Sequence, residues 1–381
     1  MAIIDSTLRE GCQAVGVSFS LAERLALVDD LVAIGIEEIE LGVASHRNPE
    51  LVELVAAIRA RHSRRVRLAL WSRCREEDIG WAAKLDLDVL SLSIPVTDRL
   101  LKSKMGCAPP KALSVAGKAV RLARRTFPYV SLGLEDATRA EPEFLDAVVD
   151  AAVRAGASRV RLADTVGIGS PGLVSRLVTR VRLRSGLAVG FHGHNDFGMA
   201  TANAVSALEA GAAWVDVTVL GLGERAGNAR LEELVAWLGL RQGMGKYDLS
   251  PLRPLCQRMA RLTGRQVSRH HPVIGEEIFA CETGLHLLGL LDDPDNYEPF
   301  PPQLMAHERR LYFGAKSGLA AVERALRNAG VLLPKSALEQ VVRNLREYAK
   351  TGGTPLAAAE LPGFALGVTK SSFQGAASLL R

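Results

Sequence analysis

Short β-rich runs alternate with longer amphipathic runs between residue 2 and about residue 240. Helical spacing is clear in LAERLALVDDLVAIG, PEFLDAVVDAAVRAG and TANAVSALEAG, and Gly35, Gly156 and Gly211 end these runs, as a glycine at a helix C-terminus does. Eight strand–helix units in about 240 residues predict a (β/α)8 TIM barrel, an α/β fold whose typical length is about 250 residues. The strand candidates are AIIDS, IEEIELG, VRLALW, DVLSLSI, YVSLGLE, RVRLAD, AVGFHGH and WVDVTVL.

A doubly wound parallel sheet is the alternative α/β fold, but no G-x-G-x-x-G motif follows the first strand. Polar residues favour the barrel, because nearly every predicted strand delivers them at its C-terminal end. Barrel enzymes build their active sites from residues at that end of several strands. The strand-end residues are Arg9, Glu10, Glu40, Arg73, Ser93, Glu135, Asp164, Thr165, His192 and His194.

The pattern changes past residue 245. The stretch 268–302 is rich in glycine, proline and acidic residues, and we expect it to be irregular but ordered. Two helical runs follow, SGLAAVERALRNAG and ALEQVVRNLREYAK. We therefore expect a catalytic barrel over residues 1–245 and a mainly helical accessory region over residues 246–381.

The composition argues against some classes of protein. A net charge of +5 and 5% aromatic residues disfavour nucleic-acid binding through base stacking. No apolar run approaches the ~18 residues of a membrane span, and charged residues occur within the first ten positions. The five cysteines are scattered without a C-x-x-C pair, which disfavours disulfides and zinc–thiolate sites. We expect a cytoplasmic protein that acts on small molecules, with neither nucleic acid nor membrane as partner.

A metal site is predicted from two segments that lie far apart in the sequence. His192 and His194 are two residues apart on a predicted strand, so both imidazoles face the same side. Glu10 follows the first strand, which neighbours the eighth when a barrel closes. This set suits a divalent Mg, Mn, Zn or Co ion acting as a Lewis acid, and Asn228 in GLGERAGNA can reach the ion or its water. The alternatives are two unrelated hydrogen-bonded histidines and a simple turn asparagine.

Arg9 stands directly before the predicted ligand Glu10. A guanidinium at this place can hold a developing oxyanion of the substrate, or it can simply form an ion pair with Glu10 or Asp5. Gln13 is expected either to support the substrate site or to be an ordinary loop residue.

Six segments together resemble the Claisen-condensing DRE-TIM metallolyase family, which comprises the homocitrate, isopropylmalate and citramalate synthases. The resemblance covers about residues 2–320, and SLSIPVTD and EDATRA are most similar to the homocitrate synthases that serve nitrogenase cofactor assembly. The segments are DSTLREGCQ, EDATRA, RLADTVG, FHGHNDFGMATANAVSALEAGA, VTVLGLGERAGNARLEEL and GEEIFACETGLH with YEPF.

The resemblance implies a metal-dependent condensation of acetyl-CoA with 2-oxoglutarate, followed by thioester hydrolysis, in a homodimer. His286 of CETGLH matches the family's base, which in relatives usually reaches the partner subunit's barrel, and Glu135 is its acidic partner. Thr165 of ADTVG matches the hydroxyl that binds the C1 carboxylate of the oxoacid. Without the resemblance, His286 would be interpreted as a surface or core histidine and Thr165 as a helix N-cap.

Some positions depart from the family pattern. Cys12 and Gly190 stand where relatives commonly have glutamate, and Cys281 and Lys316 replace histidines. Ser131 occupies the position of the arginine with which lysine-pathway homocitrate synthases bind the distal carboxylate of 2-oxoglutarate.

Another residue must bind that carboxylate, and Arg73 at the barrel mouth is the expected one, with a surface salt bridge as its alternative role. A 2-isopropylmalate or citramalate synthase remains an alternative function. A lyase running the reverse reaction and a barrel without activity are further alternatives. The accessory region opposes the lyase, and the intact Arg9, Glu10, His192 and His194 oppose the inactive barrel.

Overall fold

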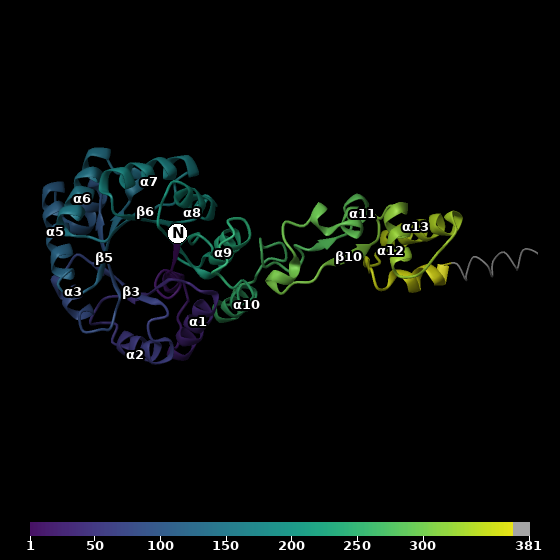
Figure 1. Cartoon of the computed structure of the whole chain (residues 1–381), viewed down its shortest axis with the longest axis horizontal. Helices are drawn as coiled ribbons and strands as arrows, with labels where there is room; N and C mark the ends of the chain where they lie inside the picture. The colour runs from purple at the N-terminus through teal and green to yellow at the C-terminus, as the bar shows by residue number, and fades with distance from the viewer. Residues whose placement is uncertain (369–381) are drawn as a thin grey trace, which may run out of the picture. The chain divides into compact units, whose positions relative to one another are not determined.

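The computed structural model describes residues 1–368 of the chain. Two compact units make it up, Met1–Gln266 and a second that begins at Val267. In the first unit, eight parallel strands pair in sequence order and β8 returns to β1, which closes a barrel ringed by helices (Figure 1). The expected (β/α)8 fold is therefore confirmed.

The strands of the barrel are β1 (Ala2–Asp5), β2 (Glu38–Val43), β3 (Arg67–Arg73), β4 (Val89–Pro95), β5 (Tyr129–Glu135), β6 (Arg159–Asp164), β7 (Ala188–Gly193) and β8 (Trp214–Val217). Its helices are α1 (Leu21–Ile34), α2 (Glu50–His62), α3 (Glu76–Ala82), α4 (Asp98–Leu100), α5 (Pro109–Ala123), α6 (Pro142–Ala155), α7 (Pro171–Ser185), α8 (Ala200–Glu209), α9 (Leu231–Leu240) and α10 (Leu252–Thr263). Short helical turns η1 (Gly11–Gln13), η2 (Leu101–Met105), η3 (Ala137–Arg139) and η4 (Val219–Gly221) follow strands β1, β4, β5 and β8. Over residues 1–368, none of the helices combines the length and the apolar character needed to cross a bilayer.

Local sequence signals explain where the helices begin and end. Ser20 caps α1 by accepting the Glu23 amide, and the Glu23 carboxylate accepts the Ser20 amide in return, which forms a capping box. Gly35 and Gly156 end α1 and α6 with φ of 95° and 84°, a left-handed conformation that glycine adopts without strain. Gly211, with φ of 96°, lies one residue beyond the C-cap of α8.

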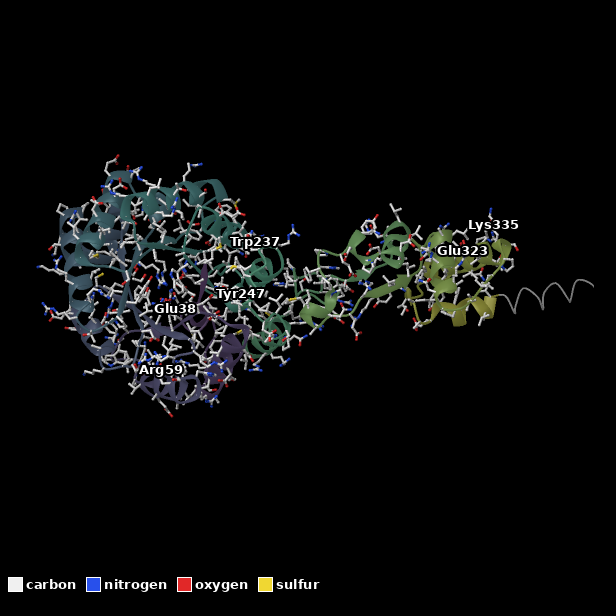
Figure 2. All side chains as sticks on the ribbon, in the orientation of Figure 1. Glu38, Arg59, Trp237, Tyr247, Glu323 and Lys335 are labelled. Atoms are coloured by element: carbon white, nitrogen blue, oxygen red, sulfur yellow. The ribbon has the colours of Figure 1, made fainter. Side chains whose placement is uncertain are left out.

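The interior of the barrel holds charged side chains near the N-terminal ends of the strands. Arg159 on β6 is fully buried, and its Nη2 lies 2.6 Å from Oε1 of Glu38 on β2. Glu38 is labelled in Figure 2. The Nε of Arg159 donates to Ser131 Oγ at 3.1 Å, and its guanidinium lies over the rings of Tyr129 and Trp214. Four strands are thus joined around one guanidinium.

The first unit ends at Gln266, about 20 residues beyond the expected boundary at residue 245. The reason is α10, which packs near α1 and α9 and buries Leu252, Leu255 and Met259 in the first unit. An amphipathic helix is part of the unit against which its apolar face packs.

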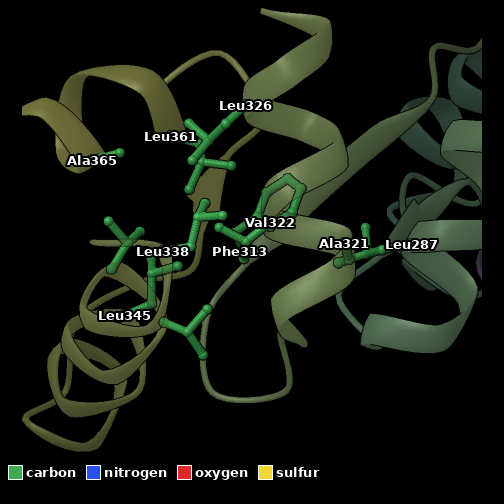
Figure 3. Packing of buried hydrophobic residues seen from close by; sticks show 11 residues of the cluster. Leu287, Phe313, Ala321, Val322, Leu326, Leu338, Leu345, Leu361 and Ala365 are labelled. Carbon is green, nitrogen blue, oxygen red and sulfur yellow. The ribbon is translucent and has the colours of Figure 1, made fainter. Parts of the chain in front are cut away.

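The second unit is mainly helical and contains a small sheet of order β11-β10-β9. It forms an apolar core of its own, in which Phe313, Val322 and Leu338 are buried together (Figure 3). Its elements are β9 (Ala280–Cys281), α11 (Gly284–Asp292), η5 (Pro294–Asn296), η6 (Pro302–Met305), β10 (Arg310–Phe313), α12 (Leu319–Asn328), α13 (Lys335–Lys350) and β11 (Leu356–Ala357), and residues 361–368 are helical.

Helices α12 and α13 confirm the two helical runs expected after residue 316. The expectation that 268–302 is irregular was wrong for α11. Leu287 and Leu290 are spaced by three residues and both are buried, so one face of this segment packs on the second unit and stabilises a helix.

Candidate active site

A cavity of about 540 Å³ lies at the C-terminal ends of the barrel strands and the loops that follow them. This is the end at which TIM barrels carry their active sites. The predicted site residues that line it are Arg9, Glu10, Gln13, Glu135, Thr165, His192 and His194. Its apolar lining includes Leu8, Leu41, Val43, Leu51 and Trp71.

Glu10, His192 and His194 form one buried group in this cavity. Their potential ligand atoms all lie within 4.8 Å of one another, and they are the group of this kind found among residues 1–368. His192 Nε2 lies 3.5 Å from Glu10 Oε1 and 3.3 Å from His194 Nε2. His192 lies on strand β7. His194 directly follows this strand, and its backbone forms a bridge with that of Asn228.

Two buried oxygens have no hydrogen-bond partner among the described residues, Glu10 Oε2 and Asn228 Oδ1, and the backbone of Asn228 pairs with that of His194. The Asn228 amide nitrogen is already used, because it donates to the carbonyl of Leu222 at 3.0 Å. Buried oxygens of this kind are costly unless something satisfies them, and a cation does so. Two imidazoles, a carboxylate and an amide oxygen therefore fit a divalent ion such as Mg, Mn, Zn or Co.

The protonation of the two histidines suits metal ligation. Asp216 Oδ2 lies 2.9 Å from His192 Nδ1, so the proton sits on Nδ1 and Nε2 is left free to bind. Burial, and next the neighbouring His192, lower the pKa of His194 to about 2, which keeps that imidazole neutral. Burial alone would raise the pKa of Asp216, but Arg161 and His192 lower it to about 2, so this carboxylate is charged.

A buried ionic network lies under the cavity. Arg9 contacts Glu10 and places its Nε 2.6 Å from Glu40 Oε2, while Arg161 Nη1 lies 3.0 Å from Glu40 Oε1 and 3.1 Å from Asp216 Oδ2. Although burial opposes its charge, Arg161 and Arg9 hold the pKa of Glu40 below its usual value. Two guanidinium ions against three carboxylates leave one net negative charge, which favours a cation in this layer. Arg9 thus forms the ion pair considered from the sequence and also lines the cavity.

Glu135, at the end of β5, is held from two sides. Its Oε1 accepts a hydrogen bond from Ser93 Oγ at 2.9 Å, and its Oε2 accepts one from Lys104 Nζ at 2.6 Å. The next residue, Asp136, has φ of 68°, a left-handed conformation that is rare for a residue with a side chain. Strained backbone of this kind is maintained only where the surroundings enforce it, and it is common at functional sites.

Thr165 helps to enforce that turn. Its Oγ1 accepts the backbone N–H of Asp136 at 2.8 Å, so its hydroxyl proton remains available to a ligand in the cavity. The N-cap of α7 is Ser170, which accepts the Leu173 amide, and Thr165 has no capping role there.

Arg73, expected to bind a second carboxylate, and Ser131, at the position of the relatives' arginine, are both absent from the described lining of this cavity. Arg73 Nε and Nη2 lie 2.7 and 3.0 Å from the two carboxylate oxygens of Asp78, and Arg73 is not among the described residues that line the cavity. Ser131 is fully buried and accepts the hydrogen bond from Arg159. The alternative role considered for Arg73, a salt bridge, is the geometry observed.

His286 belongs to the second unit. It lies on the exposed part of α11, with its ring 4.3 Å from that of Tyr297, centroid to centroid.

The sequence patterns noted Glu40 only as a polar residue at the end of a strand, and they did not single out Arg161, Asp216 or Lys104. Arg161 and Asp216 are buried charged residues within strands β6 and β8, and a charged residue within a barrel strand is the signal that could have found them. Lys104 lies in η2, and its sequence neighbourhood carries no comparable signal.

Comparisons with known proteins agree with this geometry. Residues 1–258 match the family model described as HMGL-like, and residues 273–353 match the one described as homocitrate synthase post-HMGL domain-like. A homocitrate synthase from Frankia alni is 39% identical over 86% of this chain and 93% of its own length. A 2-isopropylmalate synthase from Caldanaerobacter subterraneus is 35% identical over 94% and 93%.

Among solved structures, the hydroxymethylglutaryl-CoA lyase from Pseudomonas aeruginosa matches with a TM-score of 0.62 at 21% identity, over 70% of this chain and 93% of that one. At this identity the match supports the fold alone. The two family matches and the relatives confirm the resemblance carried by the sequence motifs. The chain belongs to the HMGL-like family of DRE-TIM metallolyases, together with the homocitrate, isopropylmalate and citramalate synthases.

Proposed function

We propose that this chain is a homocitrate synthase, which condenses acetyl-CoA with 2-oxoglutarate and hydrolyses the resulting thioester. The observation that carries the proposal is the buried group of Glu10, His192 and His194 beside Arg9 in the barrel cavity. The match of the second unit to a homocitrate synthase domain model supports the same reading.

The predicted site residues have the following roles in this proposal. A divalent ion held by Glu10, His192, His194 and Asn228 would supply Lewis acidity towards the keto group of the oxoacid. Arg9, already oriented by Glu40, stabilises negative charge that develops on the keto oxygen. Thr165 donates its free hydroxyl proton to the C1 carboxylate, and Gln13 also lines the cavity.

The reaction needs a base for the methyl group of acetyl-CoA. His286, with Glu135 as its acidic partner, takes that proton, and the methyl carbon forms a bond to the keto carbon. The keto oxygen gains a proton and becomes a hydroxyl. Water then cleaves the thioester, releasing the CoA thiol and leaving a new carboxylate.

The residues that would act together come from both units, and we propose a homodimer in which His286 serves the partner's barrel. A role of the product in nitrogenase cofactor assembly follows from the likeness of SLSIPVTD and EDATRA to the synthases of that pathway. Both points rest on the family resemblance.

A second function is favoured by the apolar wall of the cavity. Leu41, Val43, Leu51 and Trp71 would accommodate the branched side chain of 2-oxoisovalerate, the substrate of a 2-isopropylmalate synthase. The relative that is 35% identical carries that name.

The test is a thiol-release assay with acetyl-CoA and a panel of 2-oxoacids. We expect turnover with 2-oxoglutarate, loss of activity after chelation and recovery with a divalent ion. His192→Ala should weaken metal binding by roughly 10-fold or more, because it removes a ligand. His286→Ala should lower turnover about 10²–10⁴-fold with oxoacid binding retained, whereas His270→Ala, at another exposed histidine of the second unit, should not. Preference for 2-oxoisovalerate would replace the homocitrate assignment with the isopropylmalate one.

A further inference from the structure

The second carboxylate of a dicarboxylic 2-oxoacid needs a cation in the cavity, because a buried unpaired charge costs several kcal/mol. Arg73, paired with Asp78, does not line the cavity. Four cationic side chains do line it, namely Arg9, Arg24, Lys104 and Arg161.

Two of these four already bind carboxylates of the protein. Arg9 and Arg161 are almost fully buried, and both share the carboxylate of Glu40. Arg9 is also the residue proposed to stabilise the keto oxygen, so neither guanidinium is the group expected to bind the second carboxylate.

Lys104 differs from them in exposure and in partners. It lies on η2 after β4, and its side chain is 54% exposed. Its ammonium has three donors, of which one is used by Glu135 Oε2. Ser93 Oγ also donates to Glu135, so this carboxylate keeps a partner when the ammonium binds something else.

Small residues stand on the strands between the two histidines of the buried group and Lys104. On β6, Ala163 pairs with His192, and on β5, Gly133 pairs with Ser93 of β4. A Cβ at Gly133 would meet the carbonyl oxygen of Leu92 at 3.2 Å, so a larger residue fits poorly there. The strand spacing of about 4.8 Å puts β5 about 10 Å from β7, a gap that a short ligand and a lysine side chain can bridge together.

We propose that Lys104 binds the second carboxylate of the substrate and so selects dicarboxylic over monocarboxylic 2-oxoacids. The assignment rests on the proposed condensing function. Arg24 is the less suitable cation, because its Nε donates to the carbonyl of Phe19 and its Nη1 lies 4.0 Å from Glu50. Substrate choice then depends on the loop after β4 and not on an arginine of a barrel strand.

The experiment compares Lys104→Met, Lys104→Arg and Lys102→Met in the thiol-release assay with 2-oxoglutarate and with 2-oxoisovalerate. Loss of a charge-assisted hydrogen bond predicts a fall of about 10- to 100-fold in kcat/KM for 2-oxoglutarate in Lys104→Met, mainly through KM. The values for 2-oxoisovalerate should change little, and Lys104→Arg should retain most of the preference. Lys102 is an exposed lysine of the same turn outside the cavity lining, and its replacement should leave both substrates unaffected.

Equal losses for both oxoacids would overturn the assignment, since Lys104 would then act only by positioning Glu135. A selective loss in Arg24→Met, with Lys104→Met unaffected, would move the role to Arg24. If the wild-type protein turns over none of the oxoacids, the proposed function fails. Calorimetric binding of 2-oxoglutarate in the presence of Mn²⁺ then tests Lys104 independently, and equal affinity in wild type and Lys104→Met would refute its role.

Discussion

Asp216→Asn should weaken divalent metal binding although Asp216 is not itself a predicted ligand. The carboxylate fixes the proton of His192 on Nδ1 through a contact of 2.9 Å and also binds Arg161 at 3.1 Å. Asparagine has a similar size but carries no charge. The substitution therefore removes the charge that orients the imidazole and leaves the side chain in place.

The magnitude follows from two effects of the lost charge. Loss of a carboxylate behind a ligating histidine typically costs about 10- to 100-fold in metal affinity, or about 1.4–2.7 kcal/mol. The layer of Arg9, Arg161, Glu10, Glu40 and Asp216 also changes from one net negative charge to neutral, which acts in the same direction. Arg161 keeps its contact with Glu40, so we expect the barrel to remain folded.

The assay is calorimetric titration of Mn²⁺ or Zn²⁺ into protein freed of metal by chelation. Asp78→Asn is the matched control, because Asp78 is also a buried carboxylate paired with an arginine but lies on α3, outside the cavity lining. Unchanged affinity in Asp216→Asn, or an equal loss in Asp78→Asn, would refute the reasoning.

Two further predictions concern stability. Glu38→Ala leaves the fully buried Arg159 without its carboxylate and should lower the free energy of unfolding by about 3–5 kcal/mol in chemical denaturation. Glu38→Leu combined with Arg159→Met should recover most of this, and a loss below about 1 kcal/mol in Glu38→Ala would contradict the expectation. Burial raises the pKa of Glu232 from 4.5 to about 7. Between these two values the folded chain holds a proton that the unfolded chain releases, so the free energy of unfolding falls as pH rises through this range. Glu232→Gln should therefore raise the melting temperature relative to wild type more at pH 8 than at pH 5, and an equal difference at both values would count against a raised pKa.

Two features could be predicted from the sequence, the barrel and the grouping of Glu10, His192 and His194. Alternation along one strand puts His192 and His194 on the same side, and barrel closure brings Glu10 from β1 close to β7. The boundary near residue 245 and the irregular segment containing α11 were less predictable. In both cases a short amphipathic helix forms because its apolar face is covered, and which surface covers it is a property of the tertiary structure.

Residues that join distant strands could not be derived from any one segment. Glu40 on β2 meets Arg161 on β6 across the barrel, and this contact depends on the stagger of strands that do not pair with each other. The net charge of this buried ionic network could therefore be derived only from the folded structure.

Substrate choice was the hardest feature to predict, and the structure indicates a physical reason. The residues proposed to hold the metal and the keto group lie at or just after strand ends of the barrel, and relatives with the same overall similarity are named for different products. The cation proposed to select the substrate lies on η2, a turn in the loop after β4 whose course is not set by the period of a strand or helix. Arg73 had the right charge and the right strand end, but Asp78, five residues away, binds its guanidinium. A charged residue at the mouth of a barrel can therefore be assigned to a substrate only after its local partners are known.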